Sequence, residues 1–250
     1  SMMNITPLVK QLLIINVIFF LGAEFLGDIA IDIFALHYPE NPQFQLWQIL
    51  THMFMHGGFM HIAFNMFALY SFGSNLEHIW GSQKFLFFYI SCGLGAALLH
   101  EGVNYYLFHD GLKTLIENGQ NEGAIRQLLN QGMFSESWKE LLTQRQFNDF
   151  VGSYAGPVVG ASGAIYGLLV AFAYMFPNAE LMMIFLPIPI KAKYFVPAIL
   201  LLDLFLGVSG KSIFGGGGGI AHFAHIGGAA VGFLMMKKKK KNQFNDRRWN

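Results

Sequence analysis

Residues 157–176 read PVVGASGAIYGLLVAFAYMF, a stretch without charge that nevertheless places a serine among small residues. About 20 apolar residues in an α-helix cross the roughly 30 Å hydrocarbon core of a bilayer. The stretch therefore predicts a membrane-spanning helix with Ser162 close to its first turn.

The composition of the whole chain extends this interpretation. Of 250 residues, 54% are hydrophobic and only 12% are charged, whereas soluble domains carry about 25% charged residues. The apolar residues form long runs separated by polar connectors, which is typical of a polytopic membrane protein. We therefore expect an all-α fold with six transmembrane helices. They are expected near residues 5–26, 57–76, 82–108, 157–176, 194–210 and 219–236.

The distribution of basic residues predicts the orientation of these helices. Lys and Arg are enriched on the cytoplasmic side of membrane proteins. If the N-terminus lies inside, most of the basic residues become cytoplasmic, including the lysine run at 237–241. We expect both termini to be cytoplasmic and residues 237–250 to form a basic tail that follows a span. We expect no nucleic acid partner.

Two segments do not fit the pattern of spans. Residues 109–154 carry charges at short intervals and apolar groups at helical spacing, so they predict short amphipathic helices in an outer-face insertion. That insertion is either a tolerated surface element or a lid that contacts substrate. The glycine run at 215–219 predicts a flexible segment that serves as a gate or as a slack linker.

Polar side chains at membrane depth are costly and usually functional. In the expected topology the second, fourth and sixth helices run in the same direction, from outside to inside. Residues at similar distances from their starts then share one layer, within roughly 12 Å of the outer end. This layer holds His61, Asn65, Ser162 and His225.

Small residues predict that two of these helices approach closely. The fourth helix carries Gly163 and Gly167, and the sixth carries Gly228 and Gly232, each pair four residues apart. Such small-xxx-small patterns allow helix backbones to touch in a membrane. The expected packing would bring the serine and the histidine together.

The residue types in this layer indicate acyl-transfer chemistry. A serine hydroxyl becomes a nucleophile when a neighbouring imidazole accepts its proton, so Ser162 and His225 can form a catalytic dyad. No carboxylate in the apolar runs is expected to orient His225, and stacking on Tyr166 would hold the ring instead. His61, Asn65 and the backbone N–H of Ser162 can stabilise an oxyanion.

Histidines also raise the question of a metal site. His52, His56 and His61 are closely spaced, but the His-Glu-x-x-His motif is absent and no carboxylate completes the set. We therefore expect no metal and no cofactor. His52 and His56 are expected to form hydrogen bonds with the first outer loop, which runs from about residue 27 to residue 51 and is called the outer loop below.

Three motifs resemble those of the rhomboid family of intramembrane serine proteases. They read GASG at residues 160–163, AHFAHIGG at 221–228 and HIAFN at 61–65. The resemblance implies a six-helix rhomboid-like bundle that cleaves transmembrane proteins with no metal or organic cofactor. It also implies that Ser162 is the nucleophile and that His225, rather than His222, is the base.

The resemblance assigns roles to other residues as well. His61 and Asn65 would contribute to the oxyanion hole, and Tyr166, Gly160, Gly163 and His222 would support the site. Two departures from the family stand out. Gln48 occupies a position where many members have arginine, which would weaken a loop contact. The insertion is also longer than the usual loop, which affects access and specificity.

These observations predict an intramembrane serine endopeptidase that acts on transmembrane substrates within a lipid bilayer. We expect a multi-pass protein of the bacterial plasma membrane. One alternative is a catalytically inactive rhomboid-like binder of membrane helices, although such proteins usually lack the serine or the histidine. A small transporter is the other alternative, but the sequence shows no internal inverted repeat.

Overall fold

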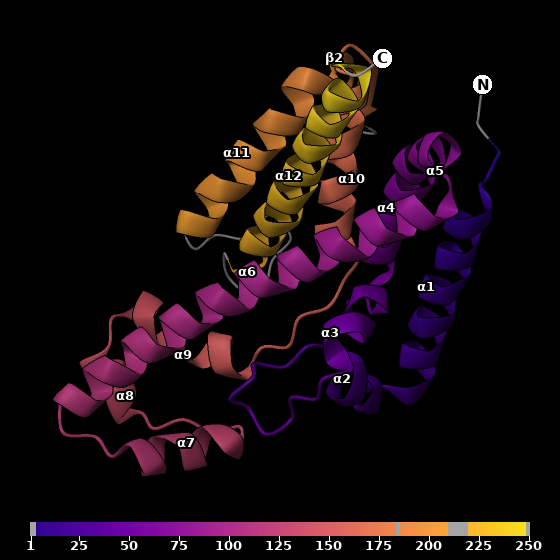
Figure 1. Cartoon of the computed structure of the whole chain (residues 1–250). Coiled ribbons are helices and arrows are strands. Elements are labelled where there is room, and N and C mark those ends of the chain that lie inside the picture. The colour runs from indigo at the N-terminus through magenta and orange to yellow at the C-terminus, as the bar shows by residue number, and fades with distance from the viewer. Residues whose placement is uncertain (1–3, 184–185, 210–219, 249–250) are drawn as a thin grey trace.

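The computed structural model describes residues 4–183, 186–209 and 220–248, and the chain is mostly helical within them. Figure 1 shows α6 crossing the molecule, with α1, α4 and α5 at one end and α7, α8 and α9 at the other. The expected glycine segment at 215–219 lies outside the described residues.

The elements before the insertion are α1 (Pro7–Leu26), α2 (Asp28–Phe34), α3 (Gln48–Thr51), η1 (His52–Phe54), α4 (Phe59–Ala68), η2 (Leu69–Gly73), α5 (Ser74–Trp80) and α6 (Ser82–Glu117). Those that follow are α7 (Glu122–Asn130), α8 (Ser137–Leu141), α9 (Gln144–Ala155), α10 (Ser162–Met175), β1 (Glu180–Met183), β2 (Leu186–Lys191), α11 (Ala192–Ser209) and α12 (Ile220–Arg248).

A carboxylate from another helix caps the start of α1. The first amides of a helix have no partner within it. The carboxylate of Glu77, in α5, accepts hydrogen bonds from the amides of Leu8 at 3.0 Å and Val9 at 2.9 Å. It also accepts the hydroxyl of Ser82 at 2.5 Å. Glu77 therefore fixes the start of α1 against the turn between α5 and α6.

The second expected helix consists of α4, η2 and α5 in direct succession. The π-helical turn η2 is the one irregularity in this succession, and such single turns often occur near functional sites. Phe72 of this turn packs edge-on against Phe172 of α10, with ring centroids 5.0 Å apart. The turn thereby places α4 beside α10.

Glycines bring α10 and α12 into backbone contact. A Cβ added to Gly228 would lie 1.8 Å from the carbonyl oxygen of Gly163, and one added to Gly232 would lie 2.9 Å from that of Gly167. This confirms the close approach that the small-xxx-small pairs predict. α6 joins the same contact, because a Cβ on Gly167 would lie 2.3 Å from the sulfur of Cys92.

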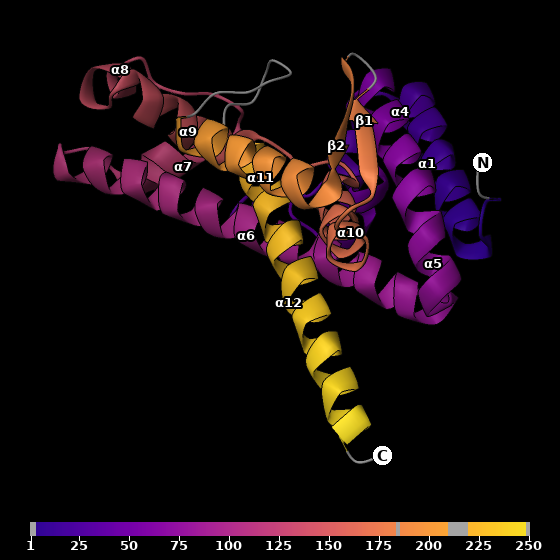
Figure 2. The ribbon, with the colours of Figure 1, turned by 90° about the horizontal axis from the view of Figure 1, so that it is seen from above.

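The insertion packs on an extension of α6. That helix continues past the expected end at residue 108 to Glu117, and Figure 2 shows α7, α8 and α9 gathered at this far end. A separate hydrophobic core joins them to α6 and to the outer loop. Its buried members are Tyr38, Phe108, Leu112, Leu115, Ile125, Leu129, Trp138, Leu142, Phe147, Phe150 and Tyr154.

Two features differ from the expected all-α arrangement with a separate tail. β1 and β2 form an antiparallel hairpin that pairs Glu180 with Lys191 and Leu181 with Ile190. Pro187 and Pro189 favour this extended form because proline cannot continue a helix ladder. At the other end α12 continues as a helix through the basic run, and Figure 2 shows it projecting from the bundle.

Length and apolar composition identify two helices within the described residues that could cross a membrane, α1 and α6. α10 is apolar but shorter, with 14 residues. The count of six spans and the cytoplasmic position of both termini therefore remain predictions.

Candidate active site

Ser162 is the first residue of α10, and hydrogen bonds fix the segment that leads to it. The backbone amides and carbonyls of Leu36 and Val158 pair in an isolated antiparallel bridge. The amide of Gly160 then donates to the carbonyl of His52 at 2.9 Å. The outer loop and η1, which follows it, therefore set the start of the helix that carries the serine.

The predicted serine and histidine are in contact. Nε2 of His225, in α12, lies 3.1 Å from Oγ of Ser162. The ring of Tyr166 stacks on the imidazole with centroids 4.3 Å apart and planes only 5° from parallel. The glycine contacts between α10 and α12 make the short distance between Ser162 and His225 possible. The stacking of Tyr166 on His225 agrees with the role expected for Tyr166.

The expectation that no carboxylate orients His225 was wrong. Asp203 of α11 is buried, with 3% exposed, and its Oδ1 lies 3.2 Å from Nδ1 of His225. The same oxygen lies 2.5 Å from Nδ1 of His222. The hydroxyl of Tyr166 also faces this carboxylate. One acid therefore contacts three side chains around the serine.

A signal for Asp203 is present in the sequence. It is a charged residue within an apolar run, and such residues are functional candidates by default. α11 runs in the opposite direction to α10 and α12, so depth has to be counted from its last residue, Ser209. Asp203 then lies roughly 9 Å from that end, at the depth of the serine layer.

His61 lies beside the serine. A Cβ on Gly160 would be 2.8 Å from Cε1 of His61 and 3.7 Å from Oγ of Ser162, so Gly160 separates the two side chains. Nδ1 of His61 accepts the amide of Gly57 at 3.4 Å, which leaves Nε2 to carry the proton and act as a donor.

Asn65 follows His61 by four residues on α4 and is 7% exposed. Within the part of the chain that the structure describes, its Nδ2 has no hydrogen-bond partner. An unpaired buried amide is costly unless a ligand or water satisfies it. Asn65 and His61 therefore supply two side-chain donors that an oxyanion could use.

Gln48 organises the outer loop beside the site. Its side chain is fully buried; Nε2 donates to the carbonyls of Gln43 at 3.0 Å and Ile33 at 3.3 Å. Oε1 accepts the amides of Gln45 at 3.1 Å and His37 at 3.3 Å. The glutamine thus makes several loop contacts at the position where we expected a weakened one.

His52 and His56, which precede α4, differ in their contacts. Nδ1 of His52 lies 2.9 Å from the carbonyl of Gln48, which agrees with the expected contact to the outer loop. The same expectation was wrong for His56, because within the described residues neither of its ring nitrogens has a hydrogen-bond partner in that loop. The ring of His56 instead packs edge-on against His61, with ring centroids 5.0 Å apart. His52 therefore belongs to the loop scaffold, and His56 borders the candidate oxyanion donors.

Asp203, His222 and His225 offer three donor atoms within 4.8 Å of one another, a set that zinc accepts in proteins. However, Nδ1 of His222 and Oδ1 of Asp203 are 2.5 Å apart. Two ligand atoms around tetrahedral zinc are roughly 3.3 Å apart, given metal–ligand distances of about 2.0 Å. The spacing favours a direct hydrogen bond over a metal site.

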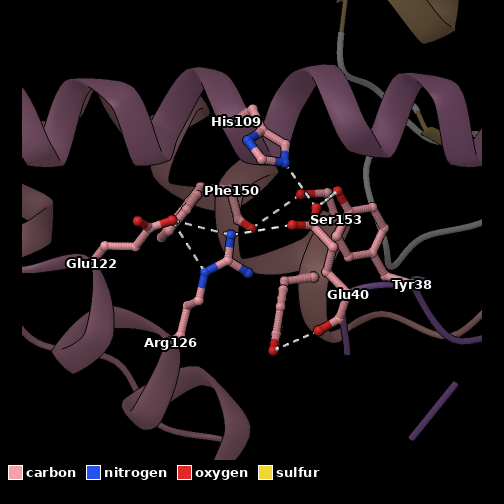
Figure 3. A network of polar contacts seen from close by, with 8 residues as sticks. Tyr38, Glu40, His109, Glu122, Arg126, Phe150 and Ser153 are labelled. Carbon is pink, nitrogen blue, oxygen red and sulfur yellow. Dashed lines mark hydrogen bonds and ion pairs between the residues drawn. The ribbon is translucent and has the colours of Figure 1, made fainter. Parts of the chain in front are cut away.

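Figure 3 shows the polar network that connects the insertion to the outer loop around Glu40. The carboxylate accepts the hydroxyl of Tyr38, Nε2 of His109 at 2.8 Å and Nη2 of Arg126 at 3.1 Å. Burial alone would raise the pKa of Glu40, but the hydrogen bonds from Tyr38, His109 and Arg126 hold it below its usual range. Glu40 therefore binds the insertion as a carboxylate.

The insertion also touches α11. Nη2 of Arg145, in α9, donates to the carbonyl of Val208 near the end of that helix. Within the described part of the chain, the insertion also packs on α6 and on the outer loop. These contacts favour a packed surface insertion over a lid.

Comparison with known proteins finds similarity to rhomboid proteins. The family model described as Rhomboid domain matches residues 43–115 and 128–240. Rhomboid protein 1, mitochondrial, from Saccharomyces cerevisiae is 25% identical over 186 residues, which cover 74% of this chain and 40% of that protein. The human presenilin-associated rhomboid-like protein, mitochondrial, is 28% identical over 203 residues, which cover 78% of this chain and 39% of that protein.

A bacterial relative is also similar. Rhomboid protease GlpG from Haemophilus influenzae is 26% identical over 152 residues, which cover 59% of this chain and 79% of that protein. The chain thus spans less than half the length of the two mitochondrial relatives. The expectation of a bacterial plasma membrane was wrong, because relatives from yeast, plant and human are mitochondrial.

Proposed function

Because the chain belongs to the rhomboid family, we propose that it is an intramembrane serine endopeptidase that cleaves transmembrane proteins through Ser162 and His225. The observation that carries this proposal is the 3.1 Å distance between Oγ of Ser162 and Nε2 of His225. It is the distance at which an imidazole can accept the serine proton.

The chemistry divides into two acyl transfers. Oγ of Ser162 attacks the scissile carbonyl while Nε2 of His225 takes its proton. His61, Asn65 and the backbone N–H of Ser162 donate to the oxyanion. The intermediate collapses as His225 returns the proton to the leaving amine. A water molecule then attacks the acyl group while Nε2 of His225 takes its proton. His225 returns that proton to Oγ of Ser162 as the bond between Oγ and the acyl carbon breaks.

The first-turn position of Ser162 suits both steps. The first amide of a helix has no acceptor within the helix, so the N–H of Ser162 is free of that ladder. The helix dipole also favours negative charge at this end. Gly160, Gly163, Tyr166 and His222 support the site by close packing, stacking and a hydrogen bond to Asp203.

The membrane setting belongs to the same proposal. Residues 1–250 would form one rhomboid membrane domain of six spans, with both termini on one side and residues 109–154 on the other. The names of the yeast, plant and human relatives support a mitochondrial membrane. The serine layer would then lie near the outer end of the spans, where water reaches it.

One experiment tests the activity. The purified chain in detergent, mixed with a transmembrane test substrate, is expected to cleave it, and Ser162→Ala is expected to abolish cleavage. A serine-directed fluorophosphonate probe should label the parent but not His225→Ala. Equal cleavage by parent and Ser162→Ala would overturn the proposal, and so would an inactive, unlabelled parent. The second outcome would favour a binder of membrane helices.

A further inference from the structure

We propose that Asp203 positions His225 for catalysis and that His222 holds Asp203 in place, so that His222, Asp203, His225 and Ser162 form one relay. This inference rests on the proposed protease activity. It differs from a Ser–His dyad because it assigns the orientation of the base to a carboxylate on a third helix.

The two ring nitrogens of His225 face opposite partners. Nδ1 lies 3.2 Å from Oδ1 of Asp203, and Nε2 lies 3.1 Å from Oγ of Ser162. A carboxylate can only accept, so Nδ1 must carry the proton and Nε2 presents its lone pair to the serine. Asp203 thereby selects the tautomer that a general base requires.

The carboxylate itself is held by a second histidine. Its oxygen has room to accept two hydrogen bonds, and Nδ1 of His222 lies only 2.5 Å away. The side chains of His222 and Asp203 are 7% and 5% exposed, so water does not compete freely for this contact. Tyr166 faces the same acid and stacks on the base. Fixed partners leave the acid little freedom to turn away from His225.

The relay also explains the cost of burying Asp203. A carboxylate in an apolar helix is expensive unless it is paired and hydrogen-bonded. Three polar partners offset that cost, and the charge lies where imidazolium forms during the reaction. α10 carries Ser162, α11 carries Asp203 and α12 carries both histidines. The relay is therefore complete only when all three helices are in register.

Kinetics of matched variants test the relay. Asp203→Asn keeps the size of the side chain but loses the charge and the tautomer control. We expect kcat to fall by about 10²-fold or more, with KM within about twofold of the parent. Asp28→Asn, on the exposed start of α2, is the matched control and should leave kcat unchanged. Parental kcat in a folded Asp203→Asn protein would overturn the proposal.

Variants of His222 test the second half of the relay. His222→Ala should lower kcat by about tenfold. His222→Asn should restore much of the loss, because its Nδ2 can occupy the place of the imidazole Nδ1. A double variant with Asp203→Asn should be no worse than Asp203→Asn alone. If Asp203→Asn does not fold, equal kcat in His222→Ala and His222→Asn would overturn the relay.

A spectroscopic measurement separates this inference from the protease activity. Histidine-labelled Ser162→Ala protein should show strongly hydrogen-bonded Nδ1–H resonances for His222 and His225, and Asp203→Asn should remove them. Their absence from Ser162→Ala would overturn the relay. If they are present while the parent cleaves no substrate and takes no probe, the protease proposal fails and the hydrogen bonds to Asp203 stand.

Discussion

Gly160 adopts a φ of +124°, a conformation that residues with a side chain rarely adopt. A Cβ at this position would also lie 2.8 Å from Cε1 of His61. Glycine is therefore required at this position for two reasons, the positive φ of its backbone and the close approach of the His61 ring. At the scale of single residues it sets the distance between a candidate oxyanion donor and the serine.

Gly160→Ala should lower kcat strongly, because the methyl group strains the backbone by about 1–3 kcal/mol and displaces His61. The measurement is cleavage of the test substrate together with the rate of probe labelling. Gly102→Ala is the matched control, since a Cβ at Gly102 meets nothing within 4 Å. Parental rates in Gly160→Ala would show that His61 does not need its present position.

Removal of metals is expected to leave activity unchanged. The short contact between His222 and Asp203 favours a hydrogen bond over an ion between them. The test is cleavage by protein dialysed against a strong chelator, with an undialysed sample as control. A loss that added zinc reverses would contradict this prediction and would assign the three donor atoms to a metal site.

At the scale of elements, the contact between α10 and α12 determines the geometry of the serine and the base. The two backbones touch at Gly163 and Gly228, one residue after Ser162 and three residues after His225. A contact so near the site transmits any change in helix separation to the Ser–His distance. Packing and catalysis therefore depend on the same glycines.

Gly228→Ala should separate the helices, because its Cβ would lie 1.8 Å from the carbonyl oxygen of Gly163. Overpacking of this kind costs about 1–3 kcal/mol or more, so we expect a lower midpoint of thermal unfolding and a large loss of kcat. Gly102→Ala, within α6, should instead stabilise by about 0.5–1 kcal/mol because alanine favours a helix. Unchanged kcat in Gly228→Ala would contradict the proposed coupling.

At the scale of the whole molecule, the insertion forms a second packed unit on the extension of α6. Its aromatic core and the Glu40 network connect it to the outer loop that also fixes the start of α10. Arg145 adds a contact with the helix that carries Asp203. A change in the packing of the insertion can therefore alter the positions of Ser162 and Asp203, through the outer loop and through α11 respectively.

The Glu40 network predicts a pH dependence of stability. The folded pKa of Glu40 is below its ordinary value, so its contribution is fully present above that ordinary value and is lost as pH falls through the lower, folded one. Glu40→Gln should lower the midpoint of thermal unfolding at about pH 7, and this difference should shrink toward about pH 3. A difference that does not depend on pH would contradict a role for the charge.

The family resemblance that the three motifs carry is confirmed by the domain match over most of the chain. The contact between Ser162 and His225 was predictable because helical periodicity and span direction fix the depth of a residue along its helix. The glycine spacing was informative for the same reason. The hairpin was missed because its prolines lie within a short segment that was read only as a connector between spans.

By itself the sequence determined which residues lie at the depth of the serine and which helix faces can touch. Only the tertiary structure decided that Asp203 faces His222 and His225, and that the insertion packs on α6 with its own core. The physical reason is that a sequence pattern fixes positions along a helix. The rotation of a helix and the identity of its neighbours depend on how all the helices pack together.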